Sequence, residues 1–314
     1  MKLNYLFYLL KPIIPRRLQL FLRRMVIRHK LKKCRAVWPI NPVAAARPKH
    51  WSGWPEEKKF ALILTHDVEN MAGTFKTLGV MRLEAEMGFR SSFNFVPERY
   101  PTPDFLRRYL IENGFEVGVH GLNHDGKLFL SRQVFQQRAL RINHYLYQWN
   151  AVGFRAPAMH HNLEWQRDLE IEYDASTFDT DPFEPQSDGV NTIFPFFVHG
   201  KDPSGGYVEL PYTLPQDFTL FILMRHKNIS LLKQKLDWIV ENGGMALINT
   251  HPDYMGFNDS HESEEYPVQY YHDFLEYVKL RYEGQYWNPL PKDLARYYKA
   301  TMLKTSVFQE VVSR

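Results

Sequence analysis

The chain has 314 residues, of which 44% are hydrophobic, 15% aromatic and 24% charged. This composition excludes a disordered or low-complexity protein, and the length allows one large hydrophobic core or two smaller ones. A single cysteine, Cys34, excludes an intramolecular disulfide framework and a multi-cysteine zinc site. Residues 1–50 hold 13 of the 39 Lys and Arg residues and none of the 35 Asp and Glu residues, which leaves a charge of −9 on the remainder. The sequence thus predicts a basic arm on an acidic body.

The first 35 residues make up this arm. After Pro15, apolar residues recur at the spacing of one helix face, and basic residues surround them, which predicts a basic amphipathic helix. The apolar positions are Leu18, Phe21, Leu22, Met25 and Val26. An apolar run at residues 3–10 is shorter than the ~20 residues that span a bilayer. A basic stretch follows it before any small-residue cleavage site, so it does not fit a signal peptide either.

We interpret residues 1–35 as an arm on the inner membrane surface, with apolar side chains among the headgroups and arginines against anionic lipid. The protein is then expected to be cytoplasmic and peripheral to the membrane. Two alternatives are that the arm docks on the protein's own acidic body or that it contacts nucleic acid. No recognisable nucleic-acid module accompanies the arm, so we expect no nucleic-acid partner. The sequence leaves the oligomeric state open.

Residues 36–57 are rich in proline and tryptophan and predict an irregular connector. Beyond them, apolar runs alternate with helix-like stretches to about residue 300, which leaves residues 301–314 as a tail. Strands are predicted at 60–64, 92–96, 115–119, 152–154, 208–210 and 246–248, and helices at 103–113, 131–149, 229–242 and 264–282. This alternation predicts one domain over residues 58–300, an α/β barrel or an open α/β sheet with parallel strands.

Four of the predicted strands end in residues that bind metals or transfer protons. In chain order these are Asp67 and Glu69, then His120 and His124, then Arg155, and finally His251. In parallel α/β architectures the carboxyl ends of the strands meet on one face, where ligands bind. The sequence therefore predicts one shared pocket built from segments nearly 200 residues apart.

His120 and His124, with Gly121 between them, are candidates for ligands of one divalent ion. Two imidazoles and one carboxylate, with open positions for water, are typical of a hydrolytic zinc site, where the metal lowers the pKa of bound water towards ~7. Asp67 supplies a carboxylate at a neighbouring strand end. The alternative is that the two histidines only cap a loop.

Four segments, in chain order, resemble the motifs of the polysaccharide deacetylase family, also called the NodB-homology domain. Residues 65–69 (Thr-His-Asp-Val-Glu) resemble the first motif and residues 120–124 (His-Gly-Leu-Asn-His) the second. Residues 155–157 (Arg-Ala-Pro) resemble the third motif and residues 247–251 the fifth, while residues 174–181 are a weaker match to the fourth. The resemblance covers about residues 58–260. It implies a distorted (β/α) barrel and a zinc-like ion that activates water against the N-acetyl amide of a sugar.

The first motif departs from the family pattern, in which a base aspartate precedes a metal-binding aspartate. Here the second position is Val68, which cannot bind metal. Strand alternation places Asp67 and Glu69 on one side of the strand and Val68 on the other. In the preferred assignment Asp67 binds the metal with His120 and His124, while Glu69 or another carboxylate acts as base. In the other assignment Asp67 is the base and Glu69 reaches the metal.

The resemblance implies two further catalytic roles. Arg155 would pair with the base carboxylate, lower its pKa and fix its orientation. His251 would be the general acid that protonates the departing amine. A nearby carboxylate such as Asp179 would raise the pKa of His251.

Residues around these motifs carry weaker expectations. His66 replaces an aromatic residue of the first motif and is expected to be a buried, hydrogen-bonded histidine. His160 and His161 are candidates for the rim of the pocket. Asp181 and Glu184 either hold sugar hydroxyls or belong to a solvated loop.

The sequence therefore indicates a metal-dependent hydrolase that removes an N-acyl group from an amino sugar, in a polysaccharide or a lipid-linked precursor of glycan biosynthesis. The alternative is a catalytically inactive, membrane-associated carbohydrate-binding relative with an altered first motif. A glycosidase with paired carboxylates, such as Asp67 and Asp179, ranks last because it leaves the histidines without a role.

Overall fold

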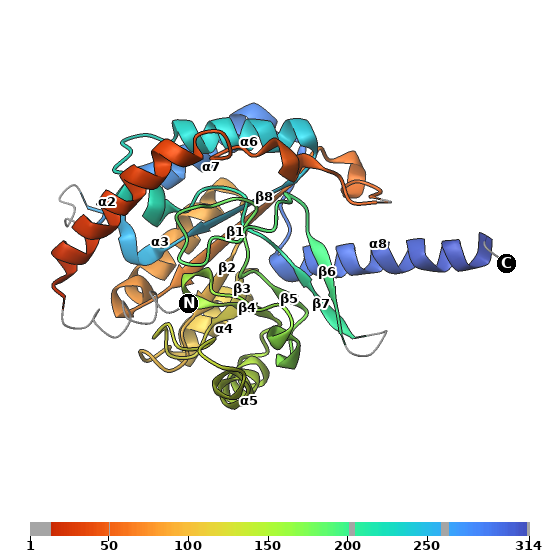
Figure 1. The fold of residues 1–314 in the computed structure, drawn as a ribbon, viewed down its shortest axis with the longest axis horizontal. Helices are drawn as coiled ribbons and strands as arrows, with labels where there is room; N and C mark the ends of the chain where they lie inside the picture. Colours follow the sequence, from red (N-terminus) through yellow and green to blue (C-terminus); the bar gives the residue numbers. More distant parts are fainter. Residues whose placement is uncertain (1–13, 50, 201–204, 259–263, 313–314) are drawn as a thin grey trace.

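The computed structural model describes residues 14–49, 51–200, 205–258 and 264–312. The predicted apolar run at 3–10 and the last two residues of the predicted tail lie outside these ranges. In the described part, helices surround one central sheet, and the C-terminal helix extends away from the body (Figure 1). Among the described helices, none is both long enough and apolar enough to cross a membrane.

A nine-stranded sheet forms the centre of the fold. Its order is β11-β1-β2-β3-β4-β5-β7-β6, and β8 also pairs with β1. All of its pairings are parallel except the antiparallel pair β6 and β7. The strands are β1 (Phe60–Val68), β2 (Ser92–Phe95), β3 (Glu116–His120), β4 (Gly153–Arg155), β5 (Tyr173–Asp174), β6 (Phe196–His199), β7 (Gly206–Glu209), β8 (Met245–Thr250) and β11 (Tyr286–Trp287). Two further short strands, β9 (Met255–Gly256) and β10 (Tyr266–Pro267), pair with each other.

The sheet curls until the segment after β7 reaches β8. The backbone N–H groups of Thr213 and Leu214 both donate to the carbonyl of Leu247, at 3.1 Å each. These bonds link the β7 side of the sheet to β8, which itself pairs with β1. The fold is therefore the distorted (β/α) barrel expected from the sequence rather than an open sheet.

The helices cover the outside of this barrel. They are α2 (Arg16–Cys34), α3 (Met71–Met87), α4 (Asp104–Glu112), α5 (Arg132–Trp149), α6 (Ser230–Asn242), α7 (Gln269–Tyr282) and α8 (Pro291–Val312), together with a short π-helical segment, η5 (Phe218–Leu223). Local sequence sets their ends. The Asn70 side chain accepts hydrogen bonds from the backbone of Ala72 and Gly73 at the start of α3. Gly243, with φ +69°, ends α6 in the left-handed conformation that glycine adopts at little cost.

The arm helix α2 packs on the body with one face and leaves the other exposed. Leu20 and Ile27 face the body and are 3% and 4% exposed. The apolar stripe identified in the sequence points outward, and its members Leu18, Phe21, Leu22, Met25 and Val26 are 46–57% exposed. The predicted helix is confirmed. It docks on the body through its inner face and at the same time exposes its apolar stripe.

Glu116, at the first residue of β3, lies at the end of the barrel opposite to the strand ends that carry the histidines. It accepts hydrogen bonds from the Tyr173 hydroxyl (2.9 Å) and from the backbone of Lys292 at the start of α8 (3.1 Å). Burial raises the pKa of Glu116 to about 7, above its ordinary value of 4.5. Ionised Glu116 therefore costs the folded state free energy that the unfolded chain does not lose.

We expect Glu116→Gln to be more stable than the wild type at pH 8, by about 3 kcal/mol, and equally stable near pH 4. A glutamine offers an acceptor to Lys292 and a donor to the Tyr173 hydroxyl without a charge. The wild-type chain should lose free energy of unfolding relative to the variant as the pH rises from about 4.5 to about 7. Urea unfolding of both proteins across this range measures the difference, and a gap that does not change with pH would contradict the assignment.

Candidate functional site

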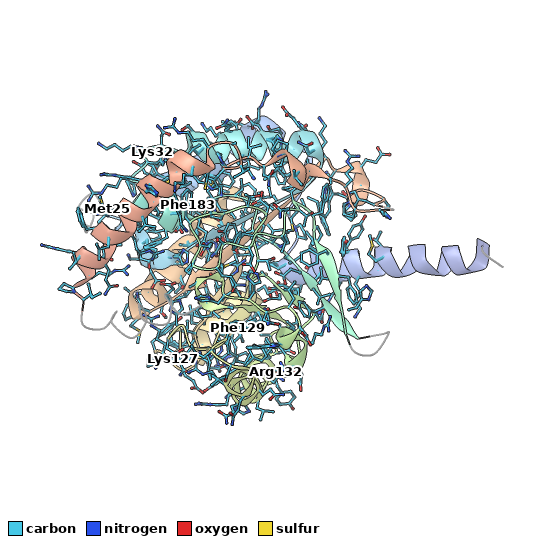
Figure 2. All side chains as sticks on the ribbon, in the orientation of Figure 1. Met25, Lys32, Lys127, Phe129, Arg132 and Phe183 are labelled. Atoms are coloured by element: carbon cyan, nitrogen blue, oxygen red, sulfur yellow. The ribbon has the colours of Figure 1, made fainter. Side chains whose placement is uncertain are left out.

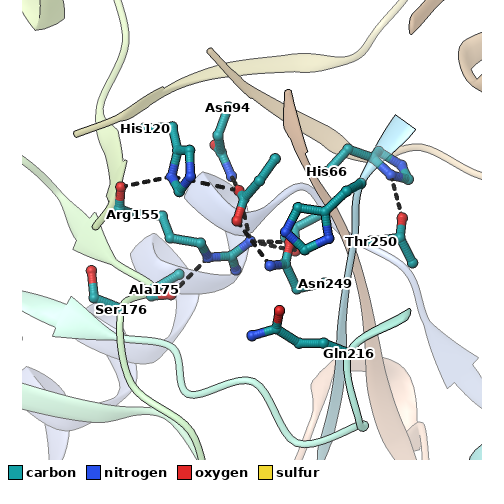
Figure 3. A network of polar contacts seen from close by, with 12 residues as sticks. His66, Asn94, His120, Arg155, Ala175, Ser176, Gln216, Asn249 and Thr250 are labelled. Carbon is teal, nitrogen blue, oxygen red and sulfur yellow. Dashed lines mark hydrogen bonds and ion pairs between the residues drawn. The ribbon is translucent and has the colours of Figure 1, made fainter. Parts of the chain in front are cut away.

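The chemistry-bearing residues meet at the carboxyl ends of β1, β3, β4 and β8. β1 is buried along its whole length, and Val68 joins the hydrophobic core. The next residue, Glu69, and the preceding one, Asp67, contact site residues instead. This is the alternation expected for an extended strand. Figure 3 shows the polar network to which Asn94, Arg155 and Asn249 belong.

The Asp67 carboxylate is held by three donors from three different segments. Asn94 Nδ2 donates to Oδ1 at 3.0 Å and Asn249 Nδ2 donates to Oδ2 at 2.8 Å. Arg155 Nη1 lies 3.3 Å from Oδ1. Burial on its own would raise the pKa of Asp67, but His120, which is charged only in the acidic range, and Arg155 outweigh this effect and hold the pKa well below its usual range. Asp67 is therefore an oriented, buried anion.

Arg155 is itself fully buried and fixed by several acceptors. Its Nε donates to the carbonyl of Ala175 at 2.7 Å, and Nη1 donates to Asn249 Oδ1 at 2.7 Å and to Thr65 Oγ1 at 2.8 Å. A buried guanidinium needs such partners because its desolvation is otherwise costly. The arrangement places its positive charge against Asp67.

Glu69, His120 and His124 form a group whose ligand atoms all lie within 4.8 Å of one another. His124 Nε2 lies 2.9 Å from Glu69 Oε1. The second carboxylate oxygen of Glu69 accepts from the Tyr254 hydroxyl at 3.1 Å. Although burial acts to raise the pKa of Glu69, the neighbouring histidines, His124 first among them, lower it well below its usual value. One carboxylate and two imidazoles thus share one small volume.

His120 has the features of a metal ligand. Its Nδ1 is 3.0 Å from the carbonyl oxygen of Arg155, so that nitrogen carries the proton and donates it. Its Nε2 is buried and has no hydrogen-bond partner among the described residues. Burial lowers the pKa of His120 to about 4, so the ring is neutral at ordinary pH. A neutral imidazole with one nitrogen fixed by a carbonyl and the other unused fits a divalent metal.

Two glycines, one in β3 and one in the loop after it, allow the close packing of these site residues. Gly118 on β3 is the register partner of Asn94, and a side chain there would clash with the Asn94 amide that donates to Asp67. Gly121 has φ +62° and lies against the ring of Pro157. Because only glycine adopts this backbone angle at low cost, Gly121 brings the His120–His124 loop close to the Arg-Ala-Pro segment.

His251 forms a second centre beside the first. Its Nδ1 is 2.7 Å from Asp217 Oδ1, and its backbone N–H donates to Asp217 Oδ2 at 2.7 Å. Its Nε2 is 3.9 Å from Glu69 Oε1. Burial would lower the pKa of His251, but Asp217, Glu69 and Asp67 raise it to about 10. His251 is thus a protonated imidazole that faces the carboxylates.

Neither a family model nor a curated protein sequence matches the chain, but solved structures do. A structure assigned as a polysaccharide deacetylase from Mycobacterium smegmatis has a TM-score of 0.60 at 17% identity, with 82% of this chain and 96% of that chain covered. Another, from Pseudomonas aeruginosa PAO1, has a TM-score of 0.61 at 14% identity and covers 83% and 98%. Puue allantoinase has a TM-score of 0.63 at 16% identity and covers 84% and 98%.

The chain has the polysaccharide deacetylase fold. At identities of 14–17% this likeness concerns the fold and not the activity. The six site residues predicted from the sequence all lie around the same strand ends of this fold. They are Asp67, Glu69, His120, His124, Arg155 and His251. Asp67, however, is outside the group of mutually close ligand atoms, and Glu69 is inside it.

The partner predicted for His251 is wrong. Asp179 does not contact this histidine; it lies 2.5 Å from Lys235 Nζ in a buried ion pair. Asp217, at the start of the π-helical segment, takes the role instead and also accepts from the Tyr266 hydroxyl at 2.8 Å. The sequence around Asp217 carries no motif that would have identified it.

The other neighbouring candidates are structural. His66 is fully buried between Thr250 Oγ1 (2.7 Å) and Glu84 Oε1 (2.8 Å), as expected. Asp181 and Glu184 are buried rather than solvated, and their carboxylates lie 2.9 and 3.0 Å from the one Tyr212 hydroxyl. No motif predicts the role of Asn94, although a polar residue in a short buried strand is a signal of such a role.

A small hollow adjoins the deacetylase-fold site on the side of His124. It is lined by Leu122, Asn123, His124, Asp125, Gly126, Leu128, Phe129, Arg138, Pro157 and His160. Figure 2 labels Phe129 in this part of the molecule. His160 therefore lies at the edge of the site, in agreement with its expected place, whereas His161 bonds to the carbonyl of Met159.

Proposed function

We propose that the protein is a metal-dependent hydrolase that removes an N-acyl group, acetyl in the simplest case, from an amino sugar of a polysaccharide or a lipid-linked glycan precursor. One observation carries the proposal: the buried Nε2 of His120 has no hydrogen-bond partner in the described part of the chain, and His120 belongs to a group of close ligand atoms with Glu69 and His124. Such an arrangement of one carboxylate and two imidazoles suits a hydrolytic metal site. The deacetylase fold and the order of the motifs support the same class of reaction.

Glu69, His120 and His124 would hold the metal, with zinc as the expected ion. When bound, it would supply Lewis acidity to the acyl oxygen and lower the pKa of water. This assignment differs from the preference drawn from the sequence, which made Asp67 the ligand. The reason is that both oxygens of Asp67 already accept hydrogen bonds from Asn94 and Asn249.

Asp67 would then be the general base. Its carboxylate is anionic, desolvated and held in one orientation by Arg155 and the two asparagines. A base fixed in this way can take the proton from an attacking water without reorganisation.

His251 would be the general acid. It is protonated because Asp217 lies against Nδ1, and its Nε2 remains on the side of Glu69. From this position Nε2–H can protonate the nitrogen that leaves as the amine. Asp217 acts through His251 by fixing the ring and stabilising its positive charge.

The alternative function is a catalytically inactive carbohydrate-binding relative. It is favoured by Val68, which stands where the family motif carries an aspartate. Glu69 compensates for this loss only if it is a ligand. Metal content therefore separates the two functions: an active enzyme binds about one ion per chain, and a folded, metal-free chain that binds sugar supports the alternative.

We expect the purified chain to release acetate from N-acetylated sugar oligomers or lipid-linked precursors. Chelation should reduce release to background, and zinc should restore it. His120→Ala should lose both metal and activity. His144→Ala, which removes an exposed histidine on α5 that belongs to neither group of possible metal ligands among the described residues, is the matched control and should retain both. Activity indifferent to chelation would overturn the metal mechanism, and new reducing ends in place of acetate would indicate a glycosidase.

Peripheral association with the inner membrane surface through residues 1–35 belongs to the same proposal. It is supported by the charge of this segment, with 13 basic and no acidic residues among the first 50, and by the exposed apolar stripe of α2.

A further inference from the structure

The two faces of α2 have different surroundings. The inner face is linked to the candidate site through aromatic side chains. Arg23 lies over the ring of Phe218, with 4.8 Å from its guanidinium carbon to the ring centroid. The ring of Phe218 is in turn 4.8 Å from that of Tyr254, whose hydroxyl donates to Glu69. A short chain of contacts therefore connects α2 to a proposed metal ligand.

Polar contacts fix α2 in this place. Arg24 donates from Nη2 to the carbonyl of Ile222 at 2.9 Å, and Lys30 Nζ donates to the carbonyl of Pro182 at 2.8 Å. Arg16 Nε lies 2.8 Å from Glu264 Oε2. These residues belong to the inner face, so their charges are engaged with the body and the orientation of the helix is determined.

The outer face is apolar in its first half and basic in its second. The exposed apolar stripe continues at helical spacing into His29, Lys32 and Lys33, which are also exposed. Arg17 and Arg28 flank it and are exposed as well. Figure 2 labels Met25 and Lys32 on this helix, at the margin of the molecule. This face is basic and apolar and has no acidic residue. It is therefore complementary to a lipid surface, which offers both anionic headgroups and apolar chains. The acidic body of a second copy would match only the basic half.

We propose that α2 lies with this outer face on an anionic bilayer and thereby holds the candidate site near the lipid surface, so that the substrate is an N-acyl amino sugar carried by a lipid. The substrate part of this inference rests on the proposed deacylase function. A helix with its side chains is about 10–12 Å across. Phe218 and Tyr254, which link α2 to Glu69, are therefore about one helix diameter from the lipid.

Flotation of the full chain with vesicles tests the docking surface. We expect binding to vesicles of phosphatidylcholine with about a third phosphatidylglycerol, and little binding to phosphatidylcholine alone, because the basic residues need anionic lipid. Phe21→Glu combined with Met25→Glu should weaken binding at least tenfold. Both side chains are more than half exposed, at 57% and 51%, so the variant should fold.

The matched control is Leu140→Glu combined with Tyr147→Glu on α5. It adds the same charge at apolar positions that are 75% and 85% exposed, on a helix at the other side of the body from α2 (Figure 1). Its vesicle binding should stay within about twofold of the wild type. Equal losses in both variants would assign the effect to net charge and overturn the proposal.

Activity on two substrates separates this inference from the proposed function. The α2 variant should keep wild-type release of acetate from a water-soluble N-acetyl amino sugar and lose at least tenfold with the same sugar on a lipid in vesicles. Absence of release from any substrate by wild type would refute the proposed function and leave the docking result standing. Unchanged vesicle binding by the α2 variant, or a wild-type dimer that this variant dissociates, would overturn the docking surface whatever the activity.

Discussion

Asp67→Asn is expected to reduce the turnover of N-acyl substrates by about 10²–10⁴-fold, the usual contribution of a general base. The amide cannot accept a proton from water, and it presents an N–H group towards donors from Asn94, Asn249 or Arg155. The effect should fall on kcat, because Asp67 is expected to act on the attacking water. Bound metal, measured by elemental analysis, should remain at the wild-type level.

Two controls make this result interpretable. Asn94→Ala removes one hydrogen bond to Asp67 but leaves the carboxylate ionised, so turnover should fall only by about tenfold. Thermal unfolding of both variants shows whether the loss of charge beside the buried Arg155 also destabilises the fold. If Asp67→Asn loses the metal, Asp67 is a metal ligand, as the preferred assignment from the sequence has it, and the base assignment is wrong.

Glu69→Gln is expected to lower zinc affinity by more than about 100-fold, a larger loss than substitution of a ligand's neighbour causes. The carboxylate is the anionic member of the group with His120 and His124, and an amide oxygen is a poorer ligand for zinc. Competition with a chromophoric chelator measures the affinity independently of activity. Turnover at limiting zinc should fall with it.

Tyr254→Phe is the matched control for Glu69. It removes the hydroxyl that donates to Glu69 Oε2 and keeps both the ring against Phe218 and the carboxylate. Zinc affinity should then fall by about 10- to 100-fold, less than in Glu69→Gln. A Glu69→Gln protein with wild-type zinc affinity would contradict the ligand assignment and favour Asp67.

The strands were largely predictable because parallel strands covered on both faces are continuous apolar runs. The six predicted runs correspond to β1, β2, β3, β4, β7 and β8. The strands β5 and β11 were missed because each has only two residues, and β6, at the edge of the sheet, was missed although Phe196, Phe197 and Val198 form a short apolar run. The four predicted helices correspond to α4, α5, α6 and α7, although α7 begins at Gln269 and not at 264.

The helix α3 was missed for a physical reason. Gly73 and Gly79 lower its helix propensity by about 1 kcal/mol each relative to alanine. The structure shows why they stand there: a side chain at Gly73 would clash with Asp253, and one at Gly79 would clash with Phe257. Tertiary packing against the segment after β8 therefore overrides the local preference.

The sequence predicted the site residues that directly follow a strand. It did not predict those that come from other parts of the fold. Asp67, His120, Arg155 and His251 follow or end apolar runs, and parallel topology brings such ends together. Asp217 reaches His251 from a π-helical segment 34 residues earlier, through a contact that only the folded chain defines. The choice between Asp67 and Glu69 likewise depends on where the Asn94 and Asn249 amides point.

The pairing of β1 with β8 has a consequence for how the molecule is made. His66 and Thr250 are register partners that lie 184 residues apart. During synthesis, β1 leaves the ribosome early and remains without this neighbour until most of the chain has been translated. Contacts of such sequence separation slow folding, and an unpaired apolar strand is prone to aggregation. Chaperone capture of the nascent chain should therefore be strongest between the emergence of β1 and that of β8.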